Sequence, residues 1–174
     1  EPIKLGMSTW LGYAPLYLAK EKGFFKKQGV DVEVVVIESP ADRIAAFAAD
    51  KIQGMATTVD THVMTTAAEN PIPVKQVLAL DDSHGGDGMV AKKEIKTIKD
   101  LKGKKVGLGP RGGASLLLSK DLFEFNEFKI SDVGATYATY EDSSQGLQDG
   151  QLDAVIIGAA HPTTSIQGLV ANKF

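Results

Sequence analysis

Apolar segments typical of β-strands alternate with amphipathic segments typical of α-helices along the whole chain. In the first half, β-branched runs predict strands and helical spacing predicts helices, in the order strand 3–8, helix 15–22, strand 30–37, helix 41–49, strand 54–59, helix 61–69 and strand 74–80. The valine-rich run 30–37 is typical of a buried strand. This alternation favours parallel sheets with helical crossovers, and hence an α/β fold.

The second half follows a polar, glycine-rich break at residues 81–88, which is the best candidate for a domain boundary and a hinge. The pattern then predicts strand 89–92, a helical turn at 98–101, strand 105–108, helix 114–125, strand 135–139, helix 141–148, strand 154–157 and helix 162–171. Two segment pairs are similar at an offset of about 100 residues, namely 4–12 with 105–113 and 47–53 with 147–153. We therefore expect two lobes of similar design, at 1–88 and 89–174.

The composition of the chain argues against several classes of function. The chain has 174 residues, 43% of them hydrophobic and 24% charged, as in ordinary globular proteins. No apolar run has the roughly 20 residues of a membrane span. The net charge of −3 argues against a nucleic-acid partner. Because the chain has no cysteine, disulfides, thiolate metal sites and cysteine nucleophiles are excluded, and we expect no cofactor.

Ligands of parallel α/β sheets bind at the carboxyl ends of strands, close to helix N-termini. The first predicted strand is followed by a hydroxyl-rich turn with an aromatic side chain, formed by Ser8, Thr9, Trp10, Gly12 and Tyr13. Alternatively, Trp10 packs into the core. A second candidate follows the third predicted strand and consists of Thr57, Thr58 and Asp60. Here Asp60 could equally be only the N-cap of the next helix.

The third candidate is the loop 109–115, which contains Arg111, Gly112, Gly113 and Ser115. It lacks the lysine of a nucleotide-binding P-loop and the spacing of a dinucleotide fingerprint. Its glycines and Arg111 instead predict a cradle for a carboxylate or phosphonate, with a solvated surface turn as the alternative. Asp82 and Ser83, in the expected hinge, complete the predicted ligand-binding set.

Metal and hydrolytic chemistry find little support. The three histidines are scattered without a metal-ligand spacing. Asp81, Asp82 and Asp87 lie close in sequence, but Lys92 stands where a calcium-binding EF-hand loop needs glutamate. No Gly-x-Ser-x-Gly motif marks a hydrolase nucleophile. We therefore expect no metal and no catalytic residue.

Several motifs resemble a known group in the right order. Residues 13–25 (YAPLYLAKEKGFF), 29–33 (GVDVE), 50–53 (DKIQ) and 95–106 (IKTIKDLKGKKV) resemble ABC-transporter solute-binding proteins of the nitrate/sulfonate/taurine class. Residues 107–113 and 140–163 instead resemble the TAXI-type receptors of TRAP transporters, and His161 joins the candidate ligand-binding residues through that second resemblance.

The resemblance implies the type 2 periplasmic binding protein fold, with two Rossmann-like lobes that grip a small anionic or amphoteric organic ligand. It implies a periplasmic or extracytoplasmic location and a membrane permease, of an ABC or a TRAP transporter, as partner. In such receptors the chain returns to complete the first lobe, and we expect that C-terminal return to be lacking here. A truncated or chimeric chain, a second chain that supplies the missing elements as in a homo-oligomer, and a shorter closure of the sheet are the alternatives.

Other functions remain as alternatives to solute binding. The thiamine-pyrimidine synthases that these receptors resemble carry a cysteine-rich motif, which this chain lacks, so we expect no enzyme activity. The effector domain of a LysR-type regulator would need a DNA-binding segment before the first strand. An engineered or truncated binding-protein scaffold without transport activity is the main alternative.

Overall fold

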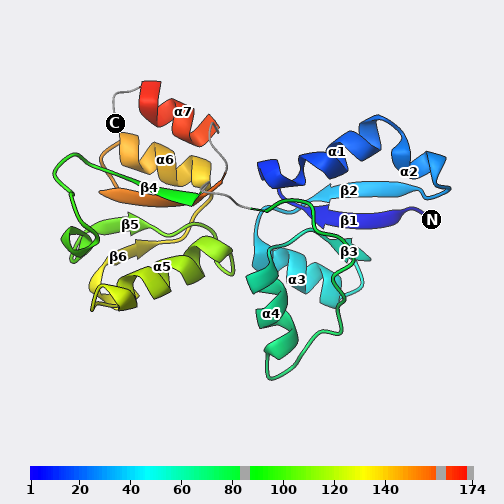
Figure 1. Cartoon of the computed structure of the whole chain (residues 1–174), viewed down its shortest axis with the longest axis horizontal. Helices are drawn as coiled ribbons and strands as arrows, with labels where there is room; N and C mark the ends of the chain where they lie inside the picture. The colour runs from blue at the N-terminus through cyan, green and yellow to red at the C-terminus, as the bar shows by residue number, and fades with distance from the viewer. Residues whose placement is uncertain (83–86, 160–163, 172–174) are drawn as a thin grey trace. The chain divides into compact units, whose positions relative to one another are not determined.

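The computed structural model describes residues 1–82, 87–159 and 164–171. It divides into two compact units, Glu1–Asp82 and Ser83–Phe174, which we call unit 1 and unit 2. Each unit has its own β-sheet with helices packed on it (Figure 1). The α/β fold that the alternating pattern predicts is therefore confirmed.

Unit 1 is built on a three-stranded parallel sheet in the order β2-β1-β3. The strands are β1 (Ile3–Met7), β2 (Val32–Val36) and β3 (Gly54–Met55). The register places Ile3 opposite Val32 and Leu5 opposite Gly54. Met7, Tyr13 and Ala56 are buried at the carboxyl ends of β1 and β3 and form a small core there.

The helices of unit 1 begin and end at residues whose local chemistry favours it. They are η1 (Leu11–Tyr13), α1 (Ala14–Glu21), α2 (Phe24–Lys27), α3 (Pro40–Ala48) and α4 (Val59–Ala67). Pro15 lies in the first turn of α1, and Gly23 adopts φ 66° just after it, which only glycine accepts without strain. Ser39 caps α3 by accepting a hydrogen bond from the Asp42 N–H at 3.3 Å.

Three strand predictions in unit 1 are wrong in detail. Residues 74–80 form no strand, and none of their backbone groups pairs with the main chain of another described residue. Val77 is 92% exposed, so its β propensity has no pleated surface to pack on. The third strand is only two residues long and stops at Met55, and Val59, its predicted last residue, already belongs to α4. β2 is an edge strand whose residues are half-buried or exposed, rather than a buried strand.

Unit 2 is built on a four-stranded mixed sheet in the order β4-β7-β5-β6. The strands are β4 (Asp87–Ala91), β5 (Lys105–Gly107), β6 (Gly134–Thr136) and β7 (Ala154–Gly158). β5 is parallel to β6 and β7, whereas β4 runs antiparallel to β7. Asp87 and Gly88, which the expected boundary assigns to the first lobe, pair with Gly158 and Ile157 of this sheet.

Helices cover both faces of the unit 2 sheet. α5 (Ala114–Phe125) lies on one face, and α6 (Tyr140–Gln148) and α7 (Thr164–Ala171) lie on the other (Figure 1). Two 3-10 turns, η2 (Ile98–Leu101) and η3 (Ile130–Asp132), precede β5 and β6. Val106, Phe123 and Ala154 are fully buried in the core between the sheet and α5.

The same backbone hydrogen bond occurs at the amino ends of the strands in both units. In unit 1 the N–H of Gln53 donates to the carbonyl of Lys4, and in unit 2 the N–H of Asp153 donates to the carbonyl of Lys105. The preceding residues, Ile52 and Leu152, are 2% and 6% exposed. The sequence similarity at an offset of about 100 residues therefore corresponds to equivalent helix–turn–strand structures.

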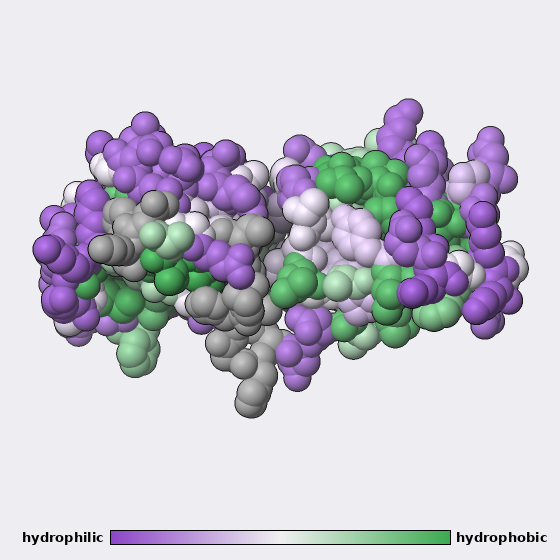
Figure 2. Space-filling model, turned by 90° about the horizontal axis from the view of Figure 1, so that it is seen from above, coloured by the Kyte–Doolittle hydropathy of each residue, from purple (hydrophilic) through white to green (hydrophobic). Residues whose placement is uncertain are grey.

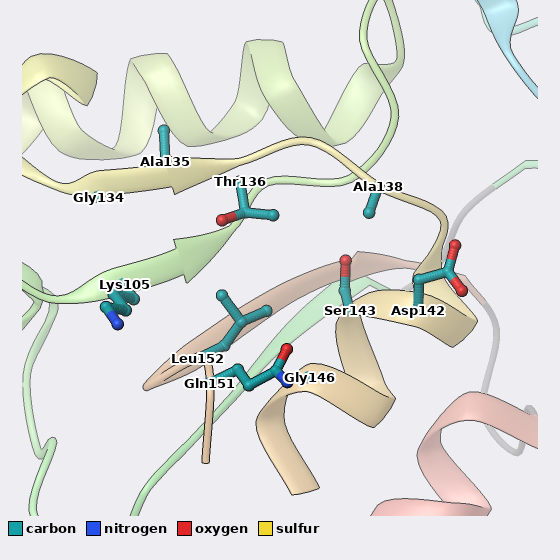
Figure 3. A pocket seen from close by; sticks show the side chains of 10 residues that line it. All are labelled: Lys105, Gly134, Ala135, Thr136, Ala138, Asp142, Ser143, Gly146, Gln151 and Leu152. Carbon is teal, nitrogen blue, oxygen red and sulfur yellow. The ribbon is translucent and has the colours of Figure 1, made fainter. Parts of the chain in front are cut away.

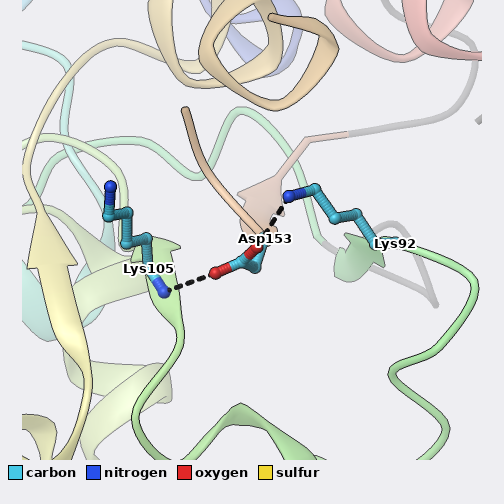
Figure 4. A network of polar contacts seen from close by, with 3 residues as sticks. All are labelled: Lys92, Lys105 and Asp153. Atoms are coloured by element: carbon cyan, nitrogen blue, oxygen red, sulfur yellow. Dashed lines mark hydrogen bonds and ion pairs between the residues drawn. The ribbon is translucent and has the colours of Figure 1, made fainter. Parts of the chain in front are cut away.

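Asp153 links three strands of unit 2 at this edge (Figure 4). Its Oδ1 lies 2.7 Å from the Lys92 Nζ, just after β4, and its Oδ2 accepts the Lys105 N–H of β5 at 2.9 Å. The Lys92 ammonium and the Lys105 N–H hold the pKa of the Asp153 carboxyl below its usual value. The network thus stabilises the edge opposite the carboxyl ends of β5 and β7.

Several large hydrophobic side chains are exposed on unit 1. Figure 2 shows hydrophobic side chains gathered among hydrophilic ones on the face of unit 1 that it presents. About half of the surface of Leu11, Leu18 and Phe24, from η1, α1 and α2, is exposed. Among the helices of the described residues, none is long and apolar enough to cross a membrane.

Candidate functional site

The carboxyl ends of β5 and β6 in unit 2 bring Arg111 and Tyr137 together. Arg111 lies in the loop that joins β5 to α5, and Tyr137 directly follows β6. The Arg111 Cζ lies 3.9 Å from the centroid of the Tyr137 ring, which is close enough for a cation–π contact. Arg111 is exposed and forms no ion pair with any described residue. Its guanidinium is therefore held on an aromatic face and available to an anion.

The loop around Arg111 ends at the N-terminus of a long helix. Gly112 adopts φ 73°, and Gly113 is the N-cap of α5. As glycine, Gly113 has no side chain that could accept a hydrogen bond from the first turn of α5. A helix N-terminus carries a partial positive charge that favours anions. The predicted residues Arg111, Gly112, Gly113 and Ser115 thus lie together, on the loop and the first turn of α5.

Ser115 is 1% exposed and lies under the loop rather than at its surface. Its Oγ is 3.3 Å from the hydroxyl of Tyr140, the first residue of α6. Burial raises the pKa of the Tyr140 hydroxyl, although its hydrogen bonds to Ser115 and to the backbone of Gly158 oppose this effect. Ser115 therefore supports the loop from below, and a ligand above the loop would not contact it directly.

In unit 1, the turn after β1 is fastened to the segment after β2. The N–H of Thr9 donates to the Glu38 carboxylate, 3.2 Å from Oε1 and 3.4 Å from Oε2. Thr9 is exposed and Ser8 is half-buried. Because Glu38 already occupies the Thr9 N–H, an anionic ligand would have to displace a carboxylate to use it. This edge therefore favours neutral or cationic groups more than the sequence indicates.

Gly12 and Trp10, both predicted to bind ligand, lie against each other at this turn. The Trp10 ring lies directly on Gly12, and a Cβ there would be 1.8 Å from Trp10 Cζ3. Trp10 also meets Tyr13 edge to face, with ring centroids 5.0 Å apart. Tyr13 is only 4% exposed, and Trp10 packs against the same small core. The packing of Trp10 against this core agrees with the alternative reading of the turn, whereas ligand binding by Trp10 and Gly12 stays a prediction.

The second predicted segment of unit 1 surrounds the N-terminus of α4. Thr58, not Asp60, is the N-cap residue, so the N-cap alternative for Asp60 is wrong. The Thr58 Oγ1 lies 3.0 Å from the Thr61 Oγ1. One carboxylate oxygen of Asp60, Oδ2, is buried and has no hydrogen-bond partner among the described residues. Thr57 is half-buried beside this turn.

The remaining predicted residues contribute little geometry. Asp82 is exposed at the end of unit 1. Ser83 and His161 lie outside the described residues. Within residues 1–82, 87–159 and 164–171, no group of three or more histidine, aspartate or glutamate side chains could hold a metal ion.

Sequence reasoning missed three side chains at these edges. Tyr137 and Tyr140 flank the predicted segment in space but lie about 25 residues from it in sequence. Arg43, in α3 of unit 1, is 3% exposed, and its Nη1 donates to the carbonyl of Ile37 at 2.6 Å. Burial lowers the pKa of the Arg43 guanidinium. A signal existed for Tyr140, because it directly follows the predicted strand 135–139, whereas Tyr137 lies inside that predicted strand and follows β6 only in the structure.

Unit 2 also has an open pocket of about 470 Å³ between β6 and α6 (Figure 3). Ser143 rises from α6 toward the sheet, and its buried Oγ has no hydrogen-bond partner among the described residues. That Oγ would lie 3.2 Å from a Cβ on Gly107, so the hydroxyl fills space that the glycine leaves. None of the residues predicted to bind ligand lines this pocket.

Comparisons with known proteins give the family. The family model described as NMT1/THI5 like matches residues 10–169 and so runs through both units. A Haemophilus influenzae protein whose name assigns it to thiamine biosynthesis is 32% identical over 145 residues, which are 83% of this chain and 45% of that protein. The Aspergillus parasiticus 4-amino-5-hydroxymethyl-2-methylpyrimidine phosphate synthase is 34% identical over 141 residues, which are 79% of this chain and 36% of the synthase.

Solved structures show the same fold. The periplasmic aliphatic sulphonate binding protein SsuA from Escherichia coli superposes with a TM-score of 0.66 at 22% identity. The match covers 98% of this chain and 57% of SsuA. This chain thus spans about half the length of the proteins it matches. The two-lobed periplasmic binding protein fold is confirmed, whereas the resemblance of the second half to TAXI receptors stays a prediction.

The relatives are mixed in activity, since they include an enzyme as well as periplasmic binding proteins. The match to residues 10–169 covers most of the sequence. This chain belongs to the NMT1/THI5-like family.

Proposed function

We propose that this protein is an extracytoplasmic solute-binding protein that captures a small organic anion and delivers it to an ABC-type permease. The observation that carries the proposal is the Arg111 guanidinium, held 3.9 Å above the Tyr137 ring with no acidic partner among the described residues. A guanidinium in this setting can form paired hydrogen bonds with a carboxylate or a sulfonate.

The surroundings of Arg111 support binding rather than catalysis. The neighbouring groups are glycine backbone, a buried serine and tyrosines, and the chain has no cysteine. Acidic residues also lie near the N-terminus of α6, since Glu141 and Asp142 belong to its first turn. This mixed charge favours a monoanion, or an amphoteric molecule, over a group with two negative charges.

A second candidate function is synthesis of the thiamine pyrimidine, favoured by the 34% identity to the Aspergillus synthase. The absence of cysteine weighs against it, because the synthases that this chain resembles carry a cysteine-rich motif. A binding protein and an enzyme differ in a direct measurement, since only the enzyme changes its ligand.

A thermal-shift panel tests the proposal. It compares sodium ethanesulfonate, nitrate and acetate with sodium chloride at equal ionic strength, and includes 4-amino-5-hydroxymethyl-2-methylpyrimidine phosphate as the arm for the second function. A ligand at about 100 times its Kd stabilises the native protein by about 2.7 kcal/mol, which raises Tm. If no anion raises Tm above the chloride control, or if Arg111→Ala responds as the wild type does, the proposal is wrong.

A further inference from the structure

The side chain of Tyr140 joins three strand ends of unit 2. Tyr140 starts α6, after β6, and its hydroxyl lies 3.3 Å from the Ser115 Oγ in the first turn of α5. The same hydroxyl is hydrogen-bonded to the backbone of Gly158 at the end of β7. Ser115 is 1% exposed, so this contact is shielded from water. One phenol therefore contacts the segments that follow β5, β6 and β7.

The loop that carries Arg111 begins against this pair of hydroxyls. Gly109 adopts φ +76°, and a Cβ at this position would lie 2.2 Å from the Ser115 Oγ and 3.1 Å from the Tyr140 Cε1. Only glycine allows the backbone to come so close. The loop ends at the first turn of α5, which contains Ser115 itself. Both ends of the loop are thus packed on the contact between Tyr140 and Ser115.

Arg111 lies in the middle of this loop and stacks on Tyr137, three residues before Tyr140. The two tyrosines belong to one short segment, so the ring in contact with Arg111 and the hydroxyl in contact with Ser115 lie only three residues apart in the chain. A neutral hydroxyl is suited to this place, because a charged group there would compete with the ligand for Arg111.

We propose that Tyr140 is a positioning residue of the anion site: through Ser115 its hydroxyl holds the loop 109–113, and so sets Arg111 on Tyr137 before the ligand binds. This inference rests on the proposed function for its role in binding, but its structural part concerns the ligand-free protein. A preformed site spares the ligand the entropic cost of ordering the loop.

Amide hydrogen exchange of the ligand-free protein tests the structural part. Tyr140→Phe keeps the ring and removes only the hydroxyl. We expect exchange at Gly112, Gly113 and Ser115 to become about 2- to 10-fold faster, as for the loss of one ordinary hydrogen bond. Ser115→Ala should have the same effect, and the double variant should add nothing to it. Tyr17→Phe in unit 1 is the matched control.

Calorimetry with sodium ethanesulfonate as the probe tests the role in binding. We expect Tyr140→Phe to weaken binding about 2- to 10-fold, and to add no further loss in an Arg111→Ala background. Unchanged exchange at the loop, or equal effects in both backgrounds, would overturn the inference. If the wild type fails to bind every anion of the panel, the proposed function fails, whereas the exchange result still decides whether Tyr140 holds the loop.

Discussion

Gln53 and Asp153 occupy equivalent positions in the two units, but one is neutral and the other charged. The Gln53 Oε1 accepts the N–H of Lys4 at 3.1 Å, and the Asp153 Oδ2 accepts the N–H of Lys105 at 2.9 Å. Asp153 also forms an ion pair with Lys92, which the neutral side chain of Gln53 cannot do. Of these two equivalent hydrogen-bond arrangements, only the one in unit 2 therefore has a stability that depends on pH.

Asp153→Asn should destabilise unit 2 by about 1–2 kcal/mol at pH 7, because it removes a charge-assisted contact at a partly exposed site. The folded structure lowers the pKa of this carboxyl, so its stabilising contribution is present above the unfolded pKa of about 3.9 and is lost as pH falls through the native value. Chemical unfolding of both proteins between pH 3 and 7 measures the difference.

Asp121→Asn is the control for this prediction, since Asp121 is an exposed carboxylate on α5. The two variants should differ at pH 7 and converge in acid. A difference between Asp153→Asn and the wild type that stays constant from pH 3 to 7 would contradict the assignment.

Arg111→Ala should weaken the binding of an anion about 10- to 100-fold, which is the loss expected for a hydrogen bond to a charged group. Lys104→Ala should change it less than about 2-fold, because Lys104 is exposed at the amino end of β5, where solvent and salt screen it. Arg111→Lys should recover only part of the affinity, since an ammonium cannot form the planar fork. Calorimetry with an anion that raises Tm in the thermal-shift panel compares the affinities of the three variants. An equal or larger loss for Lys104→Ala would show that the site does not lie at the carboxyl ends of these strands.

Tyr140→Phe should remove a step in the alkaline stability profile. The folded structure raises the pKa of Tyr140, chiefly through burial. The neutral phenol therefore stabilises the fold fully below the unfolded pKa of about 10, and this contribution is lost as pH rises through the native value. Tm measured from pH 8 to 11.5 should fall less steeply for Tyr140→Phe than for Tyr17→Phe. Parallel curves for the two variants would show that Tyr140 ionises normally.

Gly12→Ala should destabilise unit 1 by about 1–3 kcal/mol, because the new methyl group needs space that the Trp10 ring fills. The chain has a single tryptophan, so its emission reports directly on this contact. We expect a red shift together with a lower urea midpoint. Gly88→Ala, in β4, is the control, since nothing lies within 4 Å of a Cβ there. An unchanged emission maximum would mean that the ring adjusts without exposure to water.

Much of the fold could be predicted because local signals agree with the tertiary structure. Local sequence alone favours the observed conformation in three places: strand propensity at 105–108, helical spacing at 114–125 and a glycine in the left-handed conformation at Gly23. The similarity between 47–53 and 147–153 was visible for the same reason. Residues 74–80 show the limit: their apolar pattern is that of a strand, but a strand needs a partner edge, and sequence pattern does not supply one.

The candidate site, too, could be predicted from the sequence only in part. The sequence by itself determined that Arg111 and its glycines follow a strand and precede a helix, because backbone conformation there depends on neighbouring residues. Only the tertiary structure decided that Tyr137 lies under Arg111, that Tyr140 reaches Ser115 and that Trp10 covers Gly12. These contacts join side chains that are far apart in the sequence. They form because the strands end side by side in the sheet and the side chains beyond those ends pack against one another, and local sequence pattern does not determine that packing.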